Sequence, residues 1–211
     1  MHKRILKKDK TMKKILILFL LASIFGCAQE KTSLLGKTEF QRTINAEYKD
    51  ASKSPLKAKD LKDFKGLDFF KFDSSYVVTA TLKPTPDTKY FNMRTTTSRL
   101  TEKRVYGVLS FKLNGESHKL NVYQDKDLMK TEGYEDYLFL PFLDNTNGNG
   151  SYGGGRYIDL RIPEGDDMVV DFNTAYNPYC AYNSKYSCPI VPRDNYLNVN
   201  VEAGVKAFDK H

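Results

Sequence analysis

The chain has 211 residues, and its 33 Lys and Arg outnumber its 26 Asp and Glu, which gives a formal net charge of +7. Seven of the basic residues and one of the acidic residues lie in residues 1–26. Residues 27–211 therefore hold 26 basic and 25 acidic side chains, a net charge near +1. Because a nucleic-acid-binding protein needs a basic surface that contacts phosphates, this balance argues against nucleic acid as a partner.

The N-terminal segment predicts export and a lipid anchor. Lys13 and Lys14 precede an apolar run over residues 15–25, which is too short to span a bilayer and is typical of a secretory signal. Gly26-Cys27 then resembles the lipobox of bacterial lipoproteins, which implies that the Cys27 thiol is acylated and becomes the mature N-terminus. The alternative is a signal that is not cleaved or not lipidated.

The lipobox resemblance also predicts a location and a domain plan. Residues 1–26 would be a signal peptide, and a lipid on Cys27 would anchor the chain to a membrane of the bacterial cell envelope. Ala28 stands where an inner-membrane retention signal has Asp, which favours the outer membrane if the host has two. Residues 27–53 would form a tether with a short helix, and residues 54–208 a single domain long enough for a core.

Helical spacing gives way to strand spacing along the chain. Phe40, Ile44 and Tyr48 recur every four residues, which predicts an amphipathic helix, and residues 56–64 can form another helical turn. Strands are expected over residues 76–82, 91–97, 105–113, 117–123, 137–142, 156–162, 168–173 and 196–201. The expected fold is therefore mainly β, a single antiparallel β-sandwich or barrel-like domain with one or two short N-terminal helices.

One hairpin can be predicted to the residue. Asn114-Gly115 is a strong signal for a two-residue turn, because both positions tolerate a positive φ. The pairs that follow from this turn are Phe111 with His118, Leu109 with Leu120, and Gly107 with Val122. This register places His118 on the apolar side of the hairpin, either as a hydrogen-bonded core residue or in the lining of a pocket.

The small number of histidines limits the possible catalytic and metal-binding sites. His2 lies in the signal segment and His211 is the last residue, so His118 is the one histidine expected within the fold. A Ser-His-acid triad would have to use His118, and the chain has no Gly-x-Ser-x-Gly motif. A zinc site with three histidines is impossible in one chain. We expect neither a metal nor a cofactor.

A loop rich in Gly and Asn follows the strand expected over residues 137–142. Three glycines in residues 148–153 match the spacing of a dinucleotide-binding loop, but that motif requires a helix next, and residues 156–162 are expected to form a strand. Three asparagines in residues 145–149 match the start of a calcium loop, but Arg156 stands in place of its closing Glu. We interpret the loop as a flexible hairpin connection.

Charged residues on the two strands after this loop suggest a catalytic site. If residues 156–162 pair with residues 168–173 in one register, Asp159 faces Asp171, and such carboxylates repel unless they share a proton or a cation. In a register shifted by two residues, Arg161 faces Asp171 in an ordinary surface ion pair. Both registers keep the apolar faces of the two strands together.

Arg156 lies an even number of residues from the apolar positions of its expected strand, so its side chain is expected on the apolar face. We therefore expect its guanidinium at the mouth of a pocket, where it binds an anion or Asp144. With Asp159 and Asp171, these residues are the candidates for an active site.

Cys180 and Cys188 remain after Cys27 is assigned to the lipid. In an exported protein this pair is expected to form a disulfide, which would stabilise the short loop by about 2–3 kcal/mol. The alternative is two unpaired buried thiols. Their spacing is not Cys-x-x-Cys, so redox catalysis is not predicted, and with His118 they match no familiar zinc motif.

Several motifs resemble a bacterial family called domain of unknown function 1684. They are Gly-Leu-Asp-Phe-Phe at residues 66–70, residues 139–144, Ser-Tyr-Gly-Gly-Gly-Arg-Tyr at 151–157, Asp-Phe-Asn-Thr-Ala-Tyr-Asn-Pro at 171–178, Cys-Ala-Tyr at 180–182, Cys-Pro at 188–189, Asn-Tyr-Leu at 195–197 and Ala-Gly-Val-Lys at 203–206. The resemblance covers residues 54–208 and matches the short form of the family. It implies one domain and no particular activity.

Two functional hypotheses follow. The preferred one is a lipid-anchored binding module whose Gly-, Asn- and Tyr-rich loops in residues 144–195 contact a glycan, a peptide or an envelope protein. Its candidate contact residues are Tyr152, Arg156, Asn173, Tyr176, Asn177 and His118. The alternative is an envelope hydrolase that uses Asp144, Asp159 or Asp171, with Arg156 as an anion clamp. The same polar residues could also serve only to hydrogen-bond loop backbone.

Overall fold

The Asn114-Gly115 turn forms the hairpin at the centre of the sheet. In the computed structural model, which describes residues 36–208, the turn joins β3 (Leu100–Leu113) to β4 (Glu116–Asp125), and its φ angles are 52° and 82°. All three predicted pairs are present in the β3–β4 register, so this prediction is confirmed. The predicted signal segment and Cys27 lie outside the described residues.

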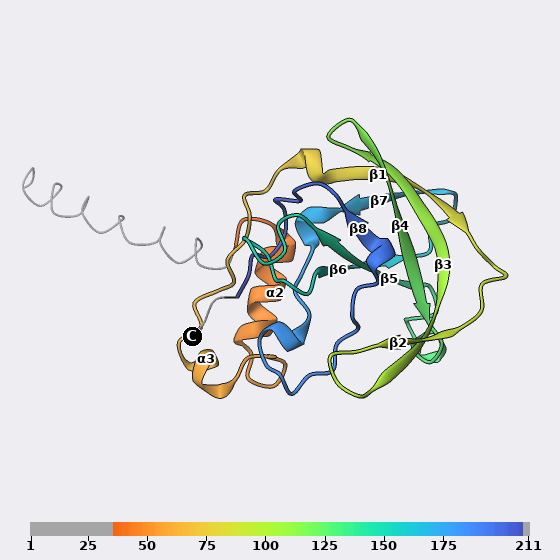
Figure 1. The fold of residues 1–211 in the computed structure, drawn as a ribbon. Coiled ribbons are helices and arrows are strands. Elements are labelled where there is room, and N and C mark those ends of the chain that lie inside the picture. Colours follow the sequence, from red (N-terminus) through yellow and green to blue (C-terminus); the bar gives the residue numbers. More distant parts are fainter. Residues whose placement is uncertain (1–35, 209–211) are drawn as a thin grey trace, which may run out of the picture.

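The other strands extend the sheet on both sides of this hairpin. They are β1 (Val77–Pro84), β2 (Phe91–Arg94), β5 (Tyr137–Asp144), β6 (Arg156–Arg161), β7 (Asp167–Asp171) and β8 (Tyr196–Leu197). The order is β6-β5-β4-β3-β1-β7, with β2 paired to β3 and β8 paired in parallel to β5. The sheet curls into a half-barrel (Figure 1), which confirms the expected mainly β, barrel-like fold.

Alternation along the strands builds the main core inside the curl. In β1, Val78, Ala80 and Leu82 are buried while their neighbours are exposed. Phe142 of β5 meets Phe172, which follows β7, edge to face at 5.3 Å between ring centroids. Each fully buried large apolar side chain contributes about 1.5–3 kcal/mol through its removal from water.

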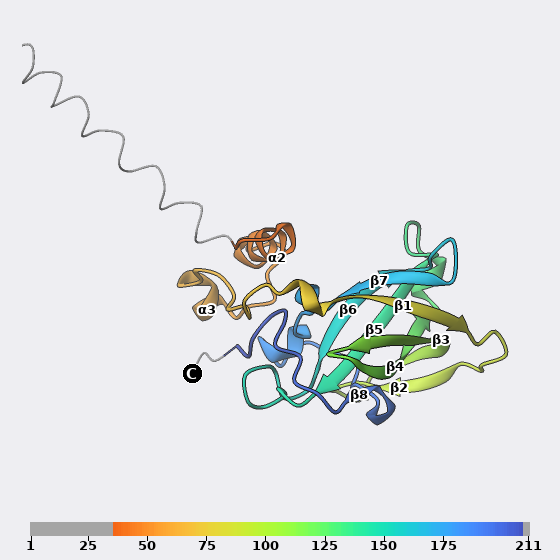
Figure 2. The same ribbon diagram turned by 90° about the horizontal axis from the view of Figure 1, so that it is seen from above.

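Two helices lie together beside the sheet (Figure 2). The N-terminus of α2 (Glu39–Lys49) has a capping box, in which Thr38 accepts from the Gln41 amide and the Gln41 side chain accepts from the Thr38 amide. The helix buries Ile44 and Tyr48, as its four-residue spacing predicts. The second helical turn is α3 (Ala58–Lys62). No helix among residues 36–208 is long and apolar enough to cross a membrane.

The C-terminal segment, residues 199–206, joins the sheet to the helices. Val201 and Ala203 are buried in the main core, whereas Val205 packs in a second cluster with Ile44 and Tyr48 of α2. Backbone hydrogen bonds of 2.8–2.9 Å connect the segment to two other parts of the chain: Val205 to Ala175, Phe70 to Gly204, and Lys206 to Asp68.

Both registers predicted for Asp171 are wrong. Its strand, β7, pairs with β1, whereas β6 pairs with β5 at the opposite edge of the sheet. Only residues 162–166 join the two strands, and a connection of this length spans at most about 20 Å. The curl of the sheet therefore brings its two edge strands, β6 and β7, close together. These strands follow each other in the sequence but do not pair through hydrogen bonds.

Gly204, the one glycine of the C-terminal segment, is expected to be hard to replace. Its φ is +77°, and a Cβ there would lie 2.4 Å from the carbonyl oxygen of Ala175. Gly204→Ala should therefore lower the free energy of unfolding by about 2–4 kcal/mol, measured by urea denaturation. Gly165→Ala is the control, because a Cβ at Gly165 meets nothing within 4 Å. Equal losses from the two variants would contradict this account.

Candidate functional site

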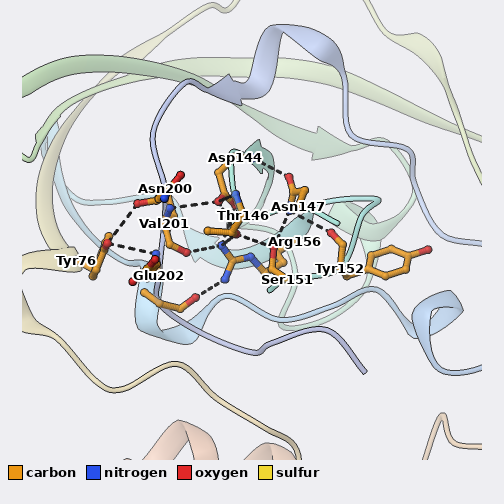
Figure 3. Close-up of polar contacts among 11 residues, drawn as sticks. Tyr76, Asp144, Thr146, Asn147, Ser151, Tyr152, Arg156, Asn200, Val201 and Glu202 are labelled. Atoms are coloured by element: carbon orange, nitrogen blue, oxygen red, sulfur yellow. Dashed lines mark hydrogen bonds and ion pairs between the residues drawn. The ribbon is translucent and has the colours of Figure 1, made fainter. Parts of the chain in front are cut away.

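Arg156 is fully buried at the start of β6 and points toward the C-terminal segment (Figure 3). Its Nη2 donates to Asp144 Oδ2 and to the Val201 carbonyl, both at 2.8 Å. Its Nη1 donates to the Ala203 carbonyl. One guanidinium thus joins the end of β5 to two backbone carbonyls of the C-terminal segment. We call this set of contacts the arginine latch.

The other oxygen of Asp144 organises the loop that follows β5. Asp144 Oδ1 accepts from the Thr146 amide at 2.8 Å, from the Thr146 hydroxyl at 2.6 Å and from the Val201 amide at 3.2 Å. The Asn147 side chain accepts from the Asp144 amide at 2.7 Å and donates to the Ser151 hydroxyl at 2.9 Å. The hydrogen bonds of these side chains are thus with backbone groups and with one another. Residues 36–208 contain no cluster of three or more His, Cys, Asp or Glu that could hold a metal ion.

The burial of the latch rules out its role as an anion clamp. Both side chains of the Arg156–Asp144 pair are 0% exposed, and burial lowers the pKa of Arg156 while Asp144 acts in the opposite direction. The rings of Phe142 and Phe70 lie 5.3 and 5.7 Å from the guanidinium. The predicted contact with Asp144 is confirmed, whereas the predicted position at a pocket mouth is wrong, because Val201 and Ala203 fill that face.

Asp171 and Asn173 form a cap at the end of β7. Asp171 Oδ1 accepts from the amide and the side chain of Asn173, each at 2.8 Å. The Asn173 side chain in turn exchanges hydrogen bonds with the backbone of Asp73. Asn177 is buried and donates to the Lys206 carbonyl at 2.8 Å. The contacts of these residues are therefore with loop backbone and with neighbouring side chains of the same loops.

His118 lies on the hairpin face that the register predicts. Its ring packs against Phe111, with 5.9 Å between ring centroids. Its Nε2 is buried and has no hydrogen-bond partner within the described part of the chain. His118 lines a pocket with residues of β1 and β3 that includes neither Arg156 nor Asp144, so His118 and the latch do not form one site.

The predicted disulfide is not present. Cys180 and Cys188 are free thiols, and the Cys180 amide donates to Cys188 Sγ at 3.1 Å. A hydrogen bond from the Cys188 thiol lowers the pKa of Cys180 to about 6. The hydroxyl of Tyr152 lies 3.9 Å from Cys180 Sγ. The alternative was two unpaired buried thiols. The thiols are unpaired, and Cys188 is buried while Cys180 is half-buried.

A pocket of about 480 Å³ lies between α2, the sheet and residues 176–189. We call it the aromatic pocket, because eight aromatic rings line it: Phe40, Tyr48, Tyr137, Phe139, Tyr157, Tyr176, Tyr179 and Tyr186. Its polar lining residues are Thr43, Glu47, Lys103, Asp159 and Ser187. A concave site with largely apolar walls and a few polar groups is the usual form of a small-ligand site.

Asp159 is an exposed carboxylate of this pocket. Its Oδ1 accepts hydrogen bonds from the hydroxyls of Tyr137 and Tyr176, both at 2.6 Å. Burial, and then the Asp159 charge, raise the pKa of both tyrosines, so they remain protonated donors at neutral pH. Asp159 Oδ2 forms no hydrogen bond within residues 36–208. The pair of hydroxyls thus fixes the carboxylate while one oxygen remains open to a ligand.

Lys103 places a buried cation beside the pocket. Its Nζ forms a 2.8 Å ion pair with Asp125 and lies 5.1 Å from the centroid of the Phe139 ring. Asp125 has a lowered pKa, because hydrogen bonds from Lys103 and from two backbone amides outweigh its burial. The Lys103 charge is therefore already neutralised within the protein.

Among the predicted site residues, Asp159, Tyr176 and Cys188 meet in the aromatic pocket. Sequence analysis missed Lys103, Tyr137, Glu47 and the pocket wall formed by α2. The four-residue spacing of Phe40 and Tyr48 did reveal the helix. This spacing did not indicate that part of the apolar face of the helix lines a pocket.

The comparison with protein families identifies the family of this chain. The family described as "Protein of unknown function (DUF1684)" matches residues 62–206, and the chain belongs to it. The solution NMR structure of an uncharacterized protein of Haloarcula marismortui is similar, with 34% sequence identity and a TM-score of 0.62 over 78% of this chain and 88% of that one. No match is found among curated proteins.

Breaking the latch should be costly. Asp144→Asn would leave the buried guanidinium without its counter-charge, which we expect to lower the free energy of unfolding by about 3–5 kcal/mol in urea denaturation. The control is Asp136→Asn, because the Arg161–Asp136 pair is about half exposed on both sides and such pairs contribute little. A latch variant as stable as the control would show that the buried pair carries no stability.

Proposed function

We propose that this member of the DUF1684 family is a lipid-anchored binding protein of the bacterial cell envelope, with the aromatic pocket as its ligand site. The observation that carries the binding proposal is an open pocket of about 480 Å³ whose exposed Asp159 carboxylate is fixed by two tyrosine hydroxyls. Preorganised polar groups within apolar walls favour ligand binding, because few side chains lose conformational freedom when the ligand binds.

The pocket uses part of the Tyr-rich block that the sequence singles out. Tyr176, Tyr179 and Tyr186 line it, and Tyr179 is 41% exposed. The Gly- and Asn-rich loop of residues 144–155 supports the site indirectly, since it contributes Asp144 to the arginine latch rather than pocket wall. Ligand contact is therefore assigned to residues 176–189, Asp159 and α2.

The hydrolase hypothesis requires an arrangement of residues that the structure does not contain. It requires Arg156 and at least two carboxylates in one accessible pocket, but Arg156 and Asp144 are both fully buried. Asp171 caps the backbone after β7, and Asp159 lies in the aromatic pocket. The candidates are thus divided among three places, and no reaction is proposed.

The lipid anchor is compatible with the position of the pocket. If Cys27 is acylated, its main chain reaches Gly36, the first described residue, over at most about 30 Å. Helix α2 begins three residues later, at Glu39, and forms one wall of the pocket. The ligand site would therefore lie close to the membrane surface.

Lipidation is tested by metabolic labelling with an alkyne-tagged palmitate in a bacterial host. The wild-type protein should carry the label, and Cys27→Ala should lose it, because the thiol is the acceptor. Cys180→Ala is the matched control and should keep the label. Labelling of Cys27→Ala at the wild-type level, or an unlabelled wild-type protein, would refute the anchor.

The pocket is tested by filling it from an exposed position. Thr43 is exposed on α2 and lines the pocket, whereas Ala46 is exposed on the same helix and does not. We expect Thr43→Trp to weaken binding of any pocket ligand at least about tenfold, because the indole occupies its volume. Ala46→Trp should leave binding unchanged.

The measurement is isothermal titration of the full chain in a nonionic detergent. The probes are choline, N-acetylglucosamine and glycylglycine, which cover an organic cation, a sugar and a peptide. Binding of one probe that Thr43→Trp weakens and Ala46→Trp spares supports the proposal. If none of the three binds, or if both variants act alike, the aromatic pocket is not a site for these ligand classes.

A further inference from the structure

The aromatic pocket is lined by eight aromatic rings, several of which meet edge to face. Tyr157 and Tyr176 meet at 88°, Tyr179 and Tyr186 at 63°, and Tyr48 and Tyr179 at 74°. Tyr179 belongs to two of these pairs and is 41% exposed. Because the face of an aromatic ring carries the negative end of its quadrupole, a pocket lined by so many rings favours a cation.

The carboxylates of the pocket add negative charge to this enclosure. Glu47 comes from α2 and Asp159 from β6, so two elements far apart in sequence supply one acid each. Burial raises the pKa of Tyr179, and the charges of Glu47 and Asp159 raise it further. Both acids therefore act on the same hydroxyl, which places Tyr179 within the field of each.

No free cation balances these acids among the described lining residues. Lys103 is the one basic side chain of the lining, and its ammonium is 2.8 Å from Asp125. The pocket itself thus carries a net negative charge from Glu47 and Asp159. An anionic ligand would be repelled by two carboxylates, whereas a cationic ligand would be attracted to both.

We infer that the aromatic pocket binds a small organic cation with an alkylammonium group, held between the tyrosine rings and the open oxygen of Asp159. This inference rests on the proposed binding function and names its ligand class. Asp159 Oδ2 is available, because the two tyrosine hydroxyls bind Oδ1. The pocket volume of about 480 Å³ is large enough for a trimethylammonium group with a short substituent.

The sharpest test compares choline with 3,3-dimethylbutan-1-ol, which has the same shape without the charge. Titration calorimetry on the full chain in a nonionic detergent should show choline binding at least about tenfold more tightly than the neutral alcohol. Equal affinities would overturn the inference. So would a preference for N-acetylglucosamine that Thr43→Trp abolishes, because the pocket would then be a site for another class of ligand.

Charge variants separate the role of the carboxylates from that of shape. Asp159→Asn should weaken choline binding about tenfold or more and leave the weak binding of the alcohol unchanged. Asp167→Asn is the matched control, since Asp167 is exposed on β7 and bonds to Thr81 outside the pocket. Choline affinity that survives Asp159→Asn would contradict the inference.

Glu47→Gln provides a second test at an exposed helix position, so that the conclusion does not depend on the folding of one variant. It should also weaken choline without weakening the alcohol, whereas an unchanged choline affinity would remove Glu47 from the site. Failure of the ligand class is distinct from failure of the binding function. In the first case another probe binds and Thr43→Trp blocks it, and in the second case none of the probes binds.

Discussion

The burial of the Arg156 guanidinium is the constraint on which the rest of the structure depends. A cation without access to water needs a counter-charge and acceptors for its donors, and an unmatched one costs several kcal/mol. Asp144 supplies the charge, and the carbonyls of Val201 and Ala203 supply acceptors. The end of β5, the start of β6 and the C-terminal segment are therefore fixed relative to one another by one side chain.

This fixed point determines where the pocket walls lie. Beyond Ala203 the chain enters Gly204, whose backbone bonds to Phe70, and Val205, which bonds to Ala175 and packs against α2. Ala175 immediately precedes Tyr176, one of the two donors to Asp159. The latch is thus connected through backbone contacts to both the helical wall and the tyrosine wall of the aromatic pocket, although neither latch side chain lines it.

Local signals in the sequence were sufficient for part of this structure. The Asn114-Gly115 turn set its own register, because two positive φ angles leave one geometry for the flanking strands, and the spacing of Phe40, Ile44 and Tyr48 revealed α2. The alternation of apolar and polar residues in β6 and β7 predicted which of their side chains face the core. It did not predict which strands pair with them, because the same two-residue period fits any neighbouring strand. The pocket could not be predicted, because its residues come from segments that meet only after the sheet curls.

The central claim is that the aromatic pocket holds an alkylammonium ion against Asp159, and a crystal structure with arsenocholine, the trimethylarsonium analogue of choline, tests it most directly. The arsenic gives an anomalous signal that identifies the ligand without reliance on its shape. We predict an arsenic peak in the pocket, between the tyrosine rings and Asp159 Oδ2. A peak elsewhere on the protein with an empty pocket, or a trimethylarsonium group turned away from Asp159, would contradict it.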